Sequence, residues 1–361
     1  MEAIRITEFV PSVSVLRPQT IPRPPAPGSN EVLVEIHSAA LNHVDILYAQ
    51  GKHQNNTSLV RPPFTLGLEF AGTVLAVGPT TTTHEDGHKS SAPPLRPGDR
   101  VFGAHLGAFA THILVPAQSL HRIPASHTFR SAAGLAATAS VAYGAVAIRA
   151  RVKQGDWVLV HGAAGGIGVY ACQIAKALGA RVIAGVRSQA DVQGKLRKIQ
   201  ELGAGCVEFD GVVVTGQEEG WAGEIRRITG GRGVDVVIDN VGLVKESLRC
   251  LRPVGGKIVL VGFAGRQGVM EKIGINRVLL RQAVIIGYRY GETNRHNPAE
   301  TVEVWTGLMK LVESGLIKPI VYEKKYDGLE GVRTAMEDLQ ARKIYGKAVI
   351  DIKQSSSRPA L

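Results

Sequence analysis

The sequence predicts an α/β protein of two domains, one of them built around a doubly wound parallel sheet. The chain has 361 residues, which is the length of about two ordinary domains. Its 42 glycines and its aromatic content of only 5% favour many tight strand-to-helix turns over a β-sandwich. Beyond residue 127, runs rich in Val and Ile alternate with segments of helical length, which is typical of buried parallel strands joined by helices.

The amino-terminal part of the chain has the pattern of short strands. Residues 31–36 alternate polar and apolar side chains, and residues 72–77 and 95–101 have the same strand character. Residues 79–94 contain four consecutive Thr and a polar run that ends in two prolines, so we expect a surface loop there.

Five apolar runs define the predicted parallel sheet, at residues 157–160, 181–186, 234–238, 257–261 and 283–286. The tail is expected to form a helix with an apolar face, a second helix at 329–340 and a final strand at 347–352. The apolar face consists of Val304, Leu308, Leu311 and Val312. A segment of about sixty residues does not easily form a domain alone, so we expect it to rejoin the first part of the chain. The predicted domains are therefore 1–126 with 293–361, and 127–292.

Composition and charge limit the function classes. A hydrophobic content of 44% and a charged content of 20% exclude intrinsic disorder. The net charge of +11 is compatible with nucleic acid, an anionic membrane or a phosphate-rich small molecule as partner. Most of the excess lies in residues 127–292, which hold 22 Lys and Arg against 13 Asp and Glu. We therefore expect a phosphate-binding domain with surplus charge, and no nucleic-acid partner.

The cysteines and the first residues of the chain indicate the cellular compartment of the protein. Cys172, Cys206 and Cys250 are far apart, so they form neither a disulfide framework nor a metal-finger spacing. The amino-terminal residues alternate like a strand and lack the apolar core of a signal peptide. We expect a soluble, cytoplasmic protein that does not bind membranes.

Residues 162–168 are the most informative stretch of the chain. They read Gly-Ala-Ala-Gly-Gly-Ile-Gly between a predicted strand and a predicted helix, with Ala164 at the second glycine position of a dinucleotide-binding turn. Small residues let the backbone approach a pyrophosphate at the helix N-terminus. The predicted cofactor contacts in this turn are Ala163, Gly165, Gly166, Ile167 and Gly168.

The end of the next strand favours NADPH over NADH. Sites for NADH usually place an acidic residue there to hold the ribose 2′-hydroxyl, but this chain has Arg187 and Ser188, and no acid before Asp191. An arginine and a hydroxyl suit a 2′-phosphate, and Lys195 is a further candidate. Arg197 remains an alternative to Lys195.

The sequence resembles the zinc-independent medium-chain dehydrogenases/reductases of the NADPH:quinone oxidoreductase group, which include enoyl reductase-type domains. The resemblance rests on residues 41–45 (Leu-Asn-His-Val-Asp), 63–72, 98–101, 161–168 and 256–264. It implies a Rossmann domain at 127–292, a mainly β, GroES-like catalytic domain from the rest of the chain, and a homodimer. It also implies cofactor contacts from Asn240, Gly262, Phe263 and Lys347.

The same resemblance indicates catalytic residues and argues against a metal. Zinc alcohol dehydrogenases have Cys where this chain has Asn42 and His where it has Leu68, and neither residue here is a good zinc ligand. Asn42 and Tyr48 are the candidate polar groups near the nicotinamide, and Tyr48 lies close to where some enoyl reductases place a proton-donating tyrosine. Asp45 is expected to hold the geometry of the segment.

Three functions remain open at this point. The first is hydride transfer from NADPH to a quinone or other conjugated carbonyl without zinc, since the cofactor supplies the chemistry and the protein supplies orientation. The second is a trans-acting enoyl reductase for acyl-CoA or carrier-bound enoyl chains, with the basic surface receiving an acidic carrier. The third is a non-enzymatic NADPH- or RNA-binding protein, which the absence of aromatic–basic RNA motifs disfavours.

Overall fold

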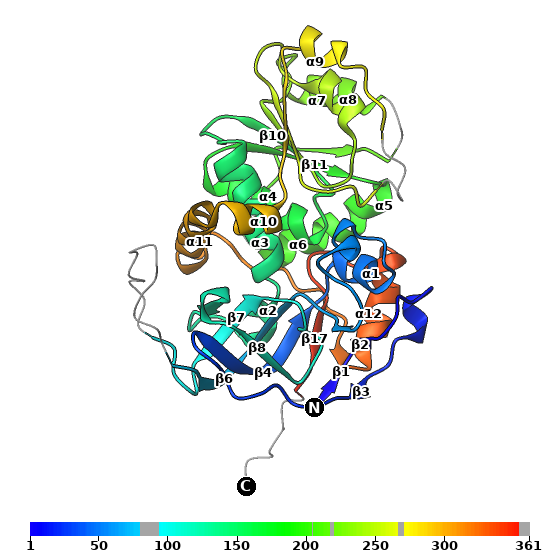
Figure 1. The fold of residues 1–361 in the computed structure, drawn as a ribbon. Helices are drawn as coiled ribbons and strands as arrows, with labels where there is room; N and C mark the ends of the chain where they lie inside the picture. Colours follow the sequence, from blue (N-terminus) through cyan, green and yellow to red (C-terminus); the bar gives the residue numbers. More distant parts are fainter. Residues whose placement is uncertain (80–93, 204, 217–219, 266–270, 354–361) are drawn as a thin grey trace. The chain divides into compact units, whose positions relative to one another are not determined.

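The computed structural model describes residues 1–79, 94–203, 205–216, 220–265 and 271–353. The chain divides into two compact units (Figure 1). Unit 1 comprises Met1–Ala137 and Val321–Leu361, and unit 2 comprises Thr138–Ile320. Among the described helices, none combines the length and the apolar character that crossing a bilayer requires.

The division differs from the boundaries expected at 127 and 292. Helix α2 (Phe129–Ala133) packs against strands of the unit 1 sheet, so unit 1 extends beyond residue 126. Helix α11 (Pro298–Glu313) packs against helix α10 (Tyr290–His296), which keeps it in unit 2. The Gln173 side chain in unit 2 also accepts from the Lys318 N–H at 2.7 Å, so unit 2 extends to residue 320.

Unit 1 is built on a seven-stranded sheet. Its central strands are β4 (Glu31–Ala40) and β6 (Glu69–Val77), which pair antiparallel. The order is β16-β17-β4-β6-β7-β9, and β8 also pairs with β4. The outer strands are β7 (Arg100–Ala104), β8 (His112–Pro116), β9 (Leu120–Arg122), β16 (Tyr326–Asp327) and β17 (Val349–Asp351).

The carboxyl-terminal segment returns to this sheet, as the sequence predicts. Strand β17 pairs antiparallel with β4, with Val349 opposite Ala40, and the two lie side by side in Figure 1. Helix α12 (Gly331–Gln340) buries Val332, Ala335 and Met336 against the same core. Two small pairs complete the unit: β1 (Glu2–Ala3) with β3 (Gln19–Thr20), and β2 (Arg5–Ile6) with β5 (Phe64–Thr65).

Strand β4 has the alternating burial that its sequence predicts, because Val32, Val34 and Ile36 face the core and the residues between them are partly exposed. Strand character over 95–101 is confirmed only from Arg100, because residues 97 and 98 form a turn. The expected loop at 79–94 lies almost wholly outside the described residues.

Unit 2 contains a six-stranded parallel sheet in the order β12-β11-β10-β13-β14-β15. Numbered along the chain this order is 3-2-1-4-5-6, which is that of a Rossmann fold. The strands are β10 (Trp157–His161), β11 (Arg181–Val186), β12 (Gly211–Val214), β13 (Val236–Asp239), β14 (Lys257–Leu260) and β15 (Val284–Gly287). The five predicted strands are confirmed, and β12 was missed.

Helices connect these strands. They are α3 (Ala136–Tyr143), α4 (Gly166–Ala177), α5 (Gln189–Asp191), α6 (Arg197–Gly203), α7 (Trp221–Ile228), α8 (Val244–Cys250) and α9 (Asn276–Leu280). In the expected apolar face of α11, Val304, Leu308 and Val312 are buried and Leu311 is partly buried. The sheet and these helices bring the ends of β10, β11 and β13 to one edge, where α/β proteins bind ligands.

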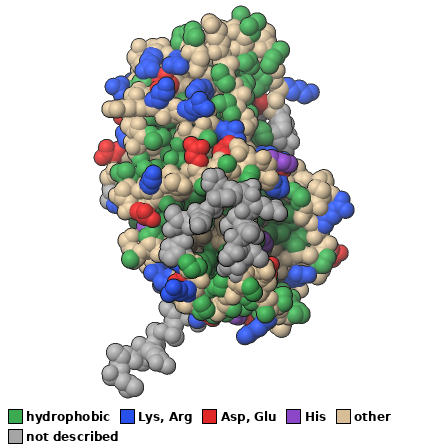
Figure 2. Space-filling model, turned by 60° about the vertical axis from the view of Figure 1, so that its left-hand side comes forward, with side chains coloured by type: hydrophobic (Ala, Val, Ile, Leu, Met, Phe, Trp, Pro, Cys, Tyr) green, Lys and Arg blue, Asp and Glu red, His purple; other side chains and the backbone are tan. Residues whose placement is uncertain are grey.

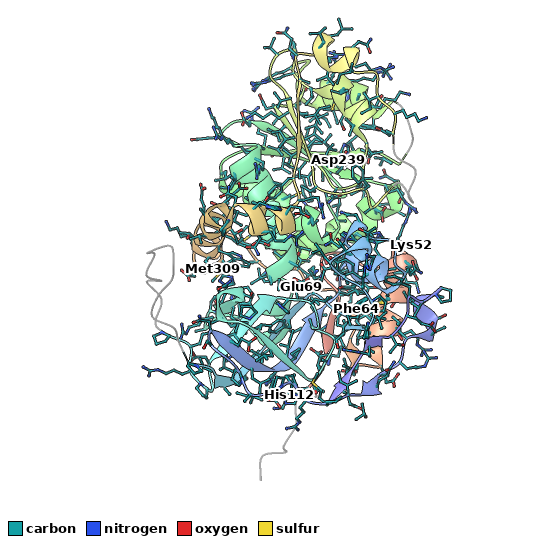
Figure 3. All side chains as sticks on the ribbon, in the orientation of Figure 1. Lys52, Phe64, Glu69, His112, Asp239 and Met309 are labelled. Carbon is teal, nitrogen blue, oxygen red and sulfur yellow. The ribbon has the colours of Figure 1, made fainter. Side chains whose placement is uncertain are left out.

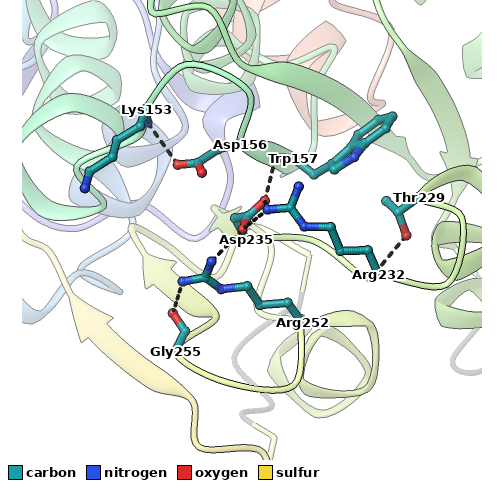
Figure 4. Close-up of polar contacts among 9 residues, drawn as sticks. Lys153, Asp156, Trp157, Thr229, Arg232, Asp235, Arg252 and Gly255 are labelled. Carbon is teal, nitrogen blue, oxygen red and sulfur yellow. Dashed lines mark hydrogen bonds and ion pairs between the residues drawn. The ribbon is translucent and has the colours of Figure 1, made fainter.

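Asp235, one residue before β13, joins two segments of the sheet (Figure 4). Its carboxylate accepts from the Trp157 N–H at 2.8 Å, which ties the start of β10 to the start of β13. Arg232 and Arg252 pair with it at 2.7 and 2.9 Å. The carboxylate is 3% exposed, and these donors compensate its burial.

Candidate active site

The loop after β10 forms the tight turn that the glycine pattern predicts. Gly162 has a φ of +60°, which residues with a side chain rarely adopt. The Gly165 N–H donates to the Gly162 carbonyl at 2.9 Å, and a Cβ at residue 168 would lie 2.1 Å from that same oxygen. The Ala163 N–H donates to the Gly185 carbonyl, which joins the turn to β11.

The predicted contacts in this turn fall into two groups. Ala163 and Gly168 are buried and shape the turn, whereas Gly165 is exposed and Gly166 and Ile167 are partly exposed. Gly165 is the N-cap of the twelve-residue helix α4 and has no side chain with which to bond the first N–H groups. These N–H groups and the helix dipole favour an anion, so the turn fits the pyrophosphate of a dinucleotide.

The three residues predicted to bind a 2′-phosphate lie together at the end of β11. Arg187 is exposed, and Ser188 and Lys195 are partly buried. Two of them contact one carboxylate: the Ser188 hydroxyl donates to Asp191 at 3.0 Å and the Lys195 ammonium lies 2.9 Å from it. Partial burial raises the pKa of Asp191, but Lys195, Ser188 and the charge of Arg187 outweigh it and hold the pKa below its usual value.

Strand β13 ends in a carboxylate that organises the next loop. Asp239, labelled in Figure 3, is fully buried and accepts the N–H groups of Val241 and Gly242 at 2.9 and 2.8 Å. It also accepts the Leu243 N–H at 2.7 Å. Asp239 is not among the predicted site residues, although an acid at the end of an apolar run, three residues before a glycine, is a signal for such a loop.

The loops after β13 and β14 place the other predicted cofactor residues of unit 2. Asn240 lies against the glycine turn, because a Cβ at residue 162 would be 2.5 Å from its Oδ1. The Ala264 N–H donates to the Asn240 carbonyl at 3.1 Å, which ties the two loops together. Gly262 is partly buried beside Asn240, and the Phe263 side chain is exposed.

In unit 1 the structure brings Asn42 and Lys347 together around a buried glutamate, Glu69. Glu69 is labelled in Figure 3. The Lys347 ammonium donates to Oδ1 of Asn42 at 2.7 Å and pairs with the Glu69 carboxylate. The Asn42 amide in turn donates to Glu69 at 2.9 Å. The second Glu69 oxygen accepts the Ala137 N–H at 2.8 Å. Lys347 is only 2% exposed and its ammonium group belongs to this network. Its predicted contact with the cofactor stays a prediction.

Asp45 supports the same segment from the first turn of helix α1 (His43–Ala49). It accepts the Asn42 N–H at 2.8 Å, in agreement with the geometric role expected of it. Burial raises the pKa of Asp45 to about 8. Among the described residues its Oδ1 has no hydrogen-bond partner, which suits a protonated carboxyl.

The Tyr48 side chain contacts two neighbouring residues, Asn55 and His53. Its hydroxyl accepts from the Asn55 amide at 2.9 Å, and its ring meets the His53 ring edge to face at 4.8 Å between centroids. The side chain is 6% exposed. Proton transfer from Tyr48 therefore requires that its hydroxyl contact the acceptor while the side chain stays packed against Asn55 and His53.

A catalytic zinc does not fit the residues of this segment. The Asn42 amide is engaged at both ends, by Lys347 and Glu69, and Leu68 offers no donor atom. Within the part of the chain that the structure describes, no group of three or more His, Cys, Asp or Glu side chains is placed to hold a metal.

Comparison with known proteins agrees with both units. Residues 28–125 match the family model for the alcohol dehydrogenase GroES-like domain, and residues 166–312 match the model named zinc-binding dehydrogenase. The quinone oxidoreductase-like protein 2 homolog of Nematostella vectensis is 31% identical over 332 residues, which cover 91% of this chain and 83% of that protein.

Solved structures give the same result. The quinone oxidoreductase of Escherichia coli, complexed with NADPH, is 27% identical and superposes with a TM-score of 0.79 over 97% of this chain and 100% of that one. A mycobacterial protein complexed with NADPH is 29% identical, with a TM-score of 0.80 over 97% and 99% of the two chains. The fold, the glycine turn and these similarities confirm the predicted family: the chain belongs to the quinone oxidoreductase-like members of the medium-chain dehydrogenase/reductase superfamily.

Proposed function

We propose that this protein is an NADPH-dependent reductase that transfers hydride to a quinone or another conjugated carbonyl without zinc. The observation that carries the proposal is the glycine turn at the N-terminus of α4, with three 2′-phosphate donors at the end of the neighbouring strand. The complexes of two relatives with NADPH and the quinone oxidoreductase names of others support it.

The residues of unit 2 hold the cofactor in this proposal. The N–H groups of Gly165, Gly166 and Ile167 bind the pyrophosphate. The donors of Arg187, Ser188 and Lys195 bind the 2′-phosphate through charge-assisted hydrogen bonds. Asn240, Gly262 and Phe263 line the path of the dinucleotide at the ends of β13 and β14. When bound, NADPH supplies the hydride from its nicotinamide ring.

The residues of unit 1 orient the acceptor. Glu69 and Lys347 hold the Asn42 amide in one orientation, because its oxygen accepts from Lys347 and its nitrogen donates to Glu69. The nitrogen of an amide carries a second N–H, which we assign to the carbonyl oxygen of the acceptor. Asp45 holds the backbone of this segment, and Tyr48 is the candidate proton donor to the reduced product.

No metal is needed for this reaction. A conjugated acceptor spreads the negative charge that arrives with the hydride onto an oxygen, so a positioned hydrogen-bond donor replaces a Lewis acid. The chemistry of Asn42 and Leu68, neither of which is a good zinc ligand, supports a reaction without zinc.

The test is NADPH oxidation by the purified chain with 9,10-phenanthrenequinone and with crotonyl-CoA. We expect the quinone to accelerate oxidation, and added zinc or a chelator to leave the rate unchanged. Acceleration by crotonyl-CoA alone favours the enoyl reductase function. If NADPH binds but neither acceptor accelerates its oxidation, the proposal is wrong.

An enoyl reductase acting on acyl-CoA or carrier-bound chains is the second candidate. A reducing polyketide synthase of Gibberella fujikuroi is 32% identical over 262 residues, which cover 71% of this chain and 10% of that protein. The basic surface offers a place for an acidic carrier: Arg226, Arg249 and Arg281 line one hollow of unit 2, together with Glu246, which pairs with Arg249. Figure 2 shows Lys and Arg side chains at several places on one face, with Asp and Glu side chains among them.

We also propose a homodimer that forms through the β15 edge of the unit 2 sheet. Strand β15 is the last in the strand order, and its Val284 and Ile285 side chains are exposed. Leu279 and Leu280 on the adjacent helix α9 and Ile275 at its N-cap are 76–80% exposed. Among the strands that the structure describes, none pairs with the outer side of β15, and such an edge flanked by exposed apolar side chains suits pairing with a second copy.

The three free cysteines further support a cytoplasmic location.

A further inference from the structure

The 2′-phosphate donors of this chain already hold an anion that belongs to the chain itself. Oδ1 of Asp191 lies 2.9 Å from the Lys195 ammonium, and Oδ2 accepts from the Ser188 hydroxyl at 3.0 Å. The Asp191 and Lys195 side chains are only 17% and 22% exposed. The positive charge of Arg187 also helps to keep the pKa of this carboxyl below its usual value.

A 2′-phosphate that binds these donors has to compete with this carboxylate. A phosphate monoester carries about two negative charges near neutral pH, so Asp191 repels it as well as occupying Ser188 and Lys195. A ribose 2′-hydroxyl is attracted to Asp191, because it can donate a hydrogen bond to the carboxylate, as in sites that bind NADH.

We propose that Asp191 sets the cofactor selectivity of this enzyme by weakening NADPH binding and supporting NADH binding. The inference rests on the proposed function, since it assigns the 2′-phosphate to Arg187, Ser188 and Lys195. Asp191 acts as an internal anion that holds Ser188 and Lys195 in place and moderates the preference for NADPH.

A purely structural role for Asp191 predicts that removing its charge leaves the relative affinities for NADPH and NADH unchanged. Ser188 is the N-cap of α5, and its hydroxyl also accepts the Asp191 N–H at 3.3 Å, so the pair stabilises the start of the helix. The Asp191→Asn variant separates the two roles. Its amide oxygen still accepts from Ser188, but the negative charge is gone.

The experiment measures the dissociation constants of NADPH and NADH for the full chain by fluorescence titration. For Asp191→Asn we expect the ratio of NADH to NADPH dissociation constants to rise about tenfold, because one like charge is removed next to the phosphate. Glu201→Gln is the matched control: it removes one negative charge from the adjacent helix α6, where Glu201 pairs with the exposed Arg197 at 3.0 Å. Its ratio should stay within about twofold of the wild type.

A double-mutant cycle with Lys195→Met provides the second measurement. The loss of NADPH affinity caused by Lys195→Met should be larger in the Asp191→Asn background, where the ammonium is no longer neutralised. If Asp191→Asn does not fold, as judged by circular dichroism, Asp191→Ser takes its place, because a serine hydroxyl also accepts from Ser188.

The outcomes separate this inference from the proposed function. An unchanged ratio in a folded Asp191 variant that binds NADPH overturns the role of Asp191 and leaves the proposed function standing. If neither the wild type nor the variant binds either cofactor, both are overturned.

Discussion

The ammonium group of Lys347 donates a 2.7 Å hydrogen bond to the amide oxygen of Asn42, a residue 305 positions away in the sequence. The same ammonium pairs with Glu69, and both charged side chains are almost fully buried. This contact joins the segment before β17 to the segment before α1 and orients the amide to which we assign the acceptor carbonyl.

Replacing Lys347 with Met should strongly destabilise unit 1. The substitution leaves the Glu69 carboxylate buried without its cation, which costs about 3 to 5 kcal/mol of unfolding free energy. Chemical denaturation measures the loss. Lys353→Met is the control: its ammonium pairs with Glu35 at 2.8 Å but is 50% exposed, so its loss should cost less than about 1 kcal/mol. Equal losses in the two variants would contradict the importance of the buried pair.

Asp45 should make stability depend on pH. Its pKa in the folded chain is about 8, above the unfolded value, so the folded state binds the proton more tightly. The stabilisation is complete below the unfolded pKa and is lost as the pH rises toward 8, by at most about 1.4 kcal/mol per pH unit. Urea denaturation at pH 5, 6.5 and 8 should show this loss in the wild type and a smaller one in Asp45→Asn. The same pH dependence in both proteins would exclude Asp45 as its source.

Arg187→Ala should weaken NADPH binding about tenfold and change NADH binding by less than about twofold, because only NADPH has the 2′-phosphate that the guanidinium binds. Titration with both cofactors measures this. Arg181→Ala is the control at the other end of β11, where the guanidinium lies 5.2 Å from the centre of the Trp157 ring. An Arg187→Ala variant that binds NADPH as tightly as the wild type would contradict the role of Arg187 in a 2′-phosphate site.

Asp235→Ala should destabilise unit 2 by about 3 kcal/mol, because two guanidinium groups and the Trp157 N–H lose their acceptor. Thermal or urea unfolding measures the loss. Asp156→Ala is the control: its carboxylate accepts the Lys153 N–H in an exposed turn (Figure 4), so the expected cost is about 1 kcal/mol. A similar small cost for Asp235→Ala would show that the network of Figure 4 contributes little.

Leu279→Lys should convert the proposed homodimer into a monomer, since it places a charge in the apolar patch next to β15. Sedimentation velocity of the wild type and the variant measures the assembly state. Val302→Lys on α11 is the control, because Val302 is also exposed, at 66%, but lies on another helix of unit 2. A monomeric wild type would contradict the dimer itself, and a dimeric Leu279→Lys would contradict its location.

How much of this could be predicted from the sequence differs between the two units. In unit 2 the strands β10, β11, β13, β14 and β15 and the glycine turn were predicted, because buried parallel strands and a turn that only glycine tolerates leave local patterns. Strand β12 was missed because its four residues, of which one is fully buried, make too short a run. The boundaries at 127 and 292 differ from those of the structure, since contacts between helices decided which segments pack together.

The sequence by itself determined the family, the parallel sheet and the position of the dinucleotide turn, because each depends on residues that are neighbours in the chain. Only the tertiary structure decided that Lys347 and Glu69 hold Asn42. This contact spans hundreds of residues, and a buried ion pair has no periodic pattern in the sequence. The contacts of Asp191 with Ser188 and Lys195 lie between the two cases: they join residues three and four positions apart, but the structure was needed to show that this acid faces the donors of the predicted 2′-phosphate site.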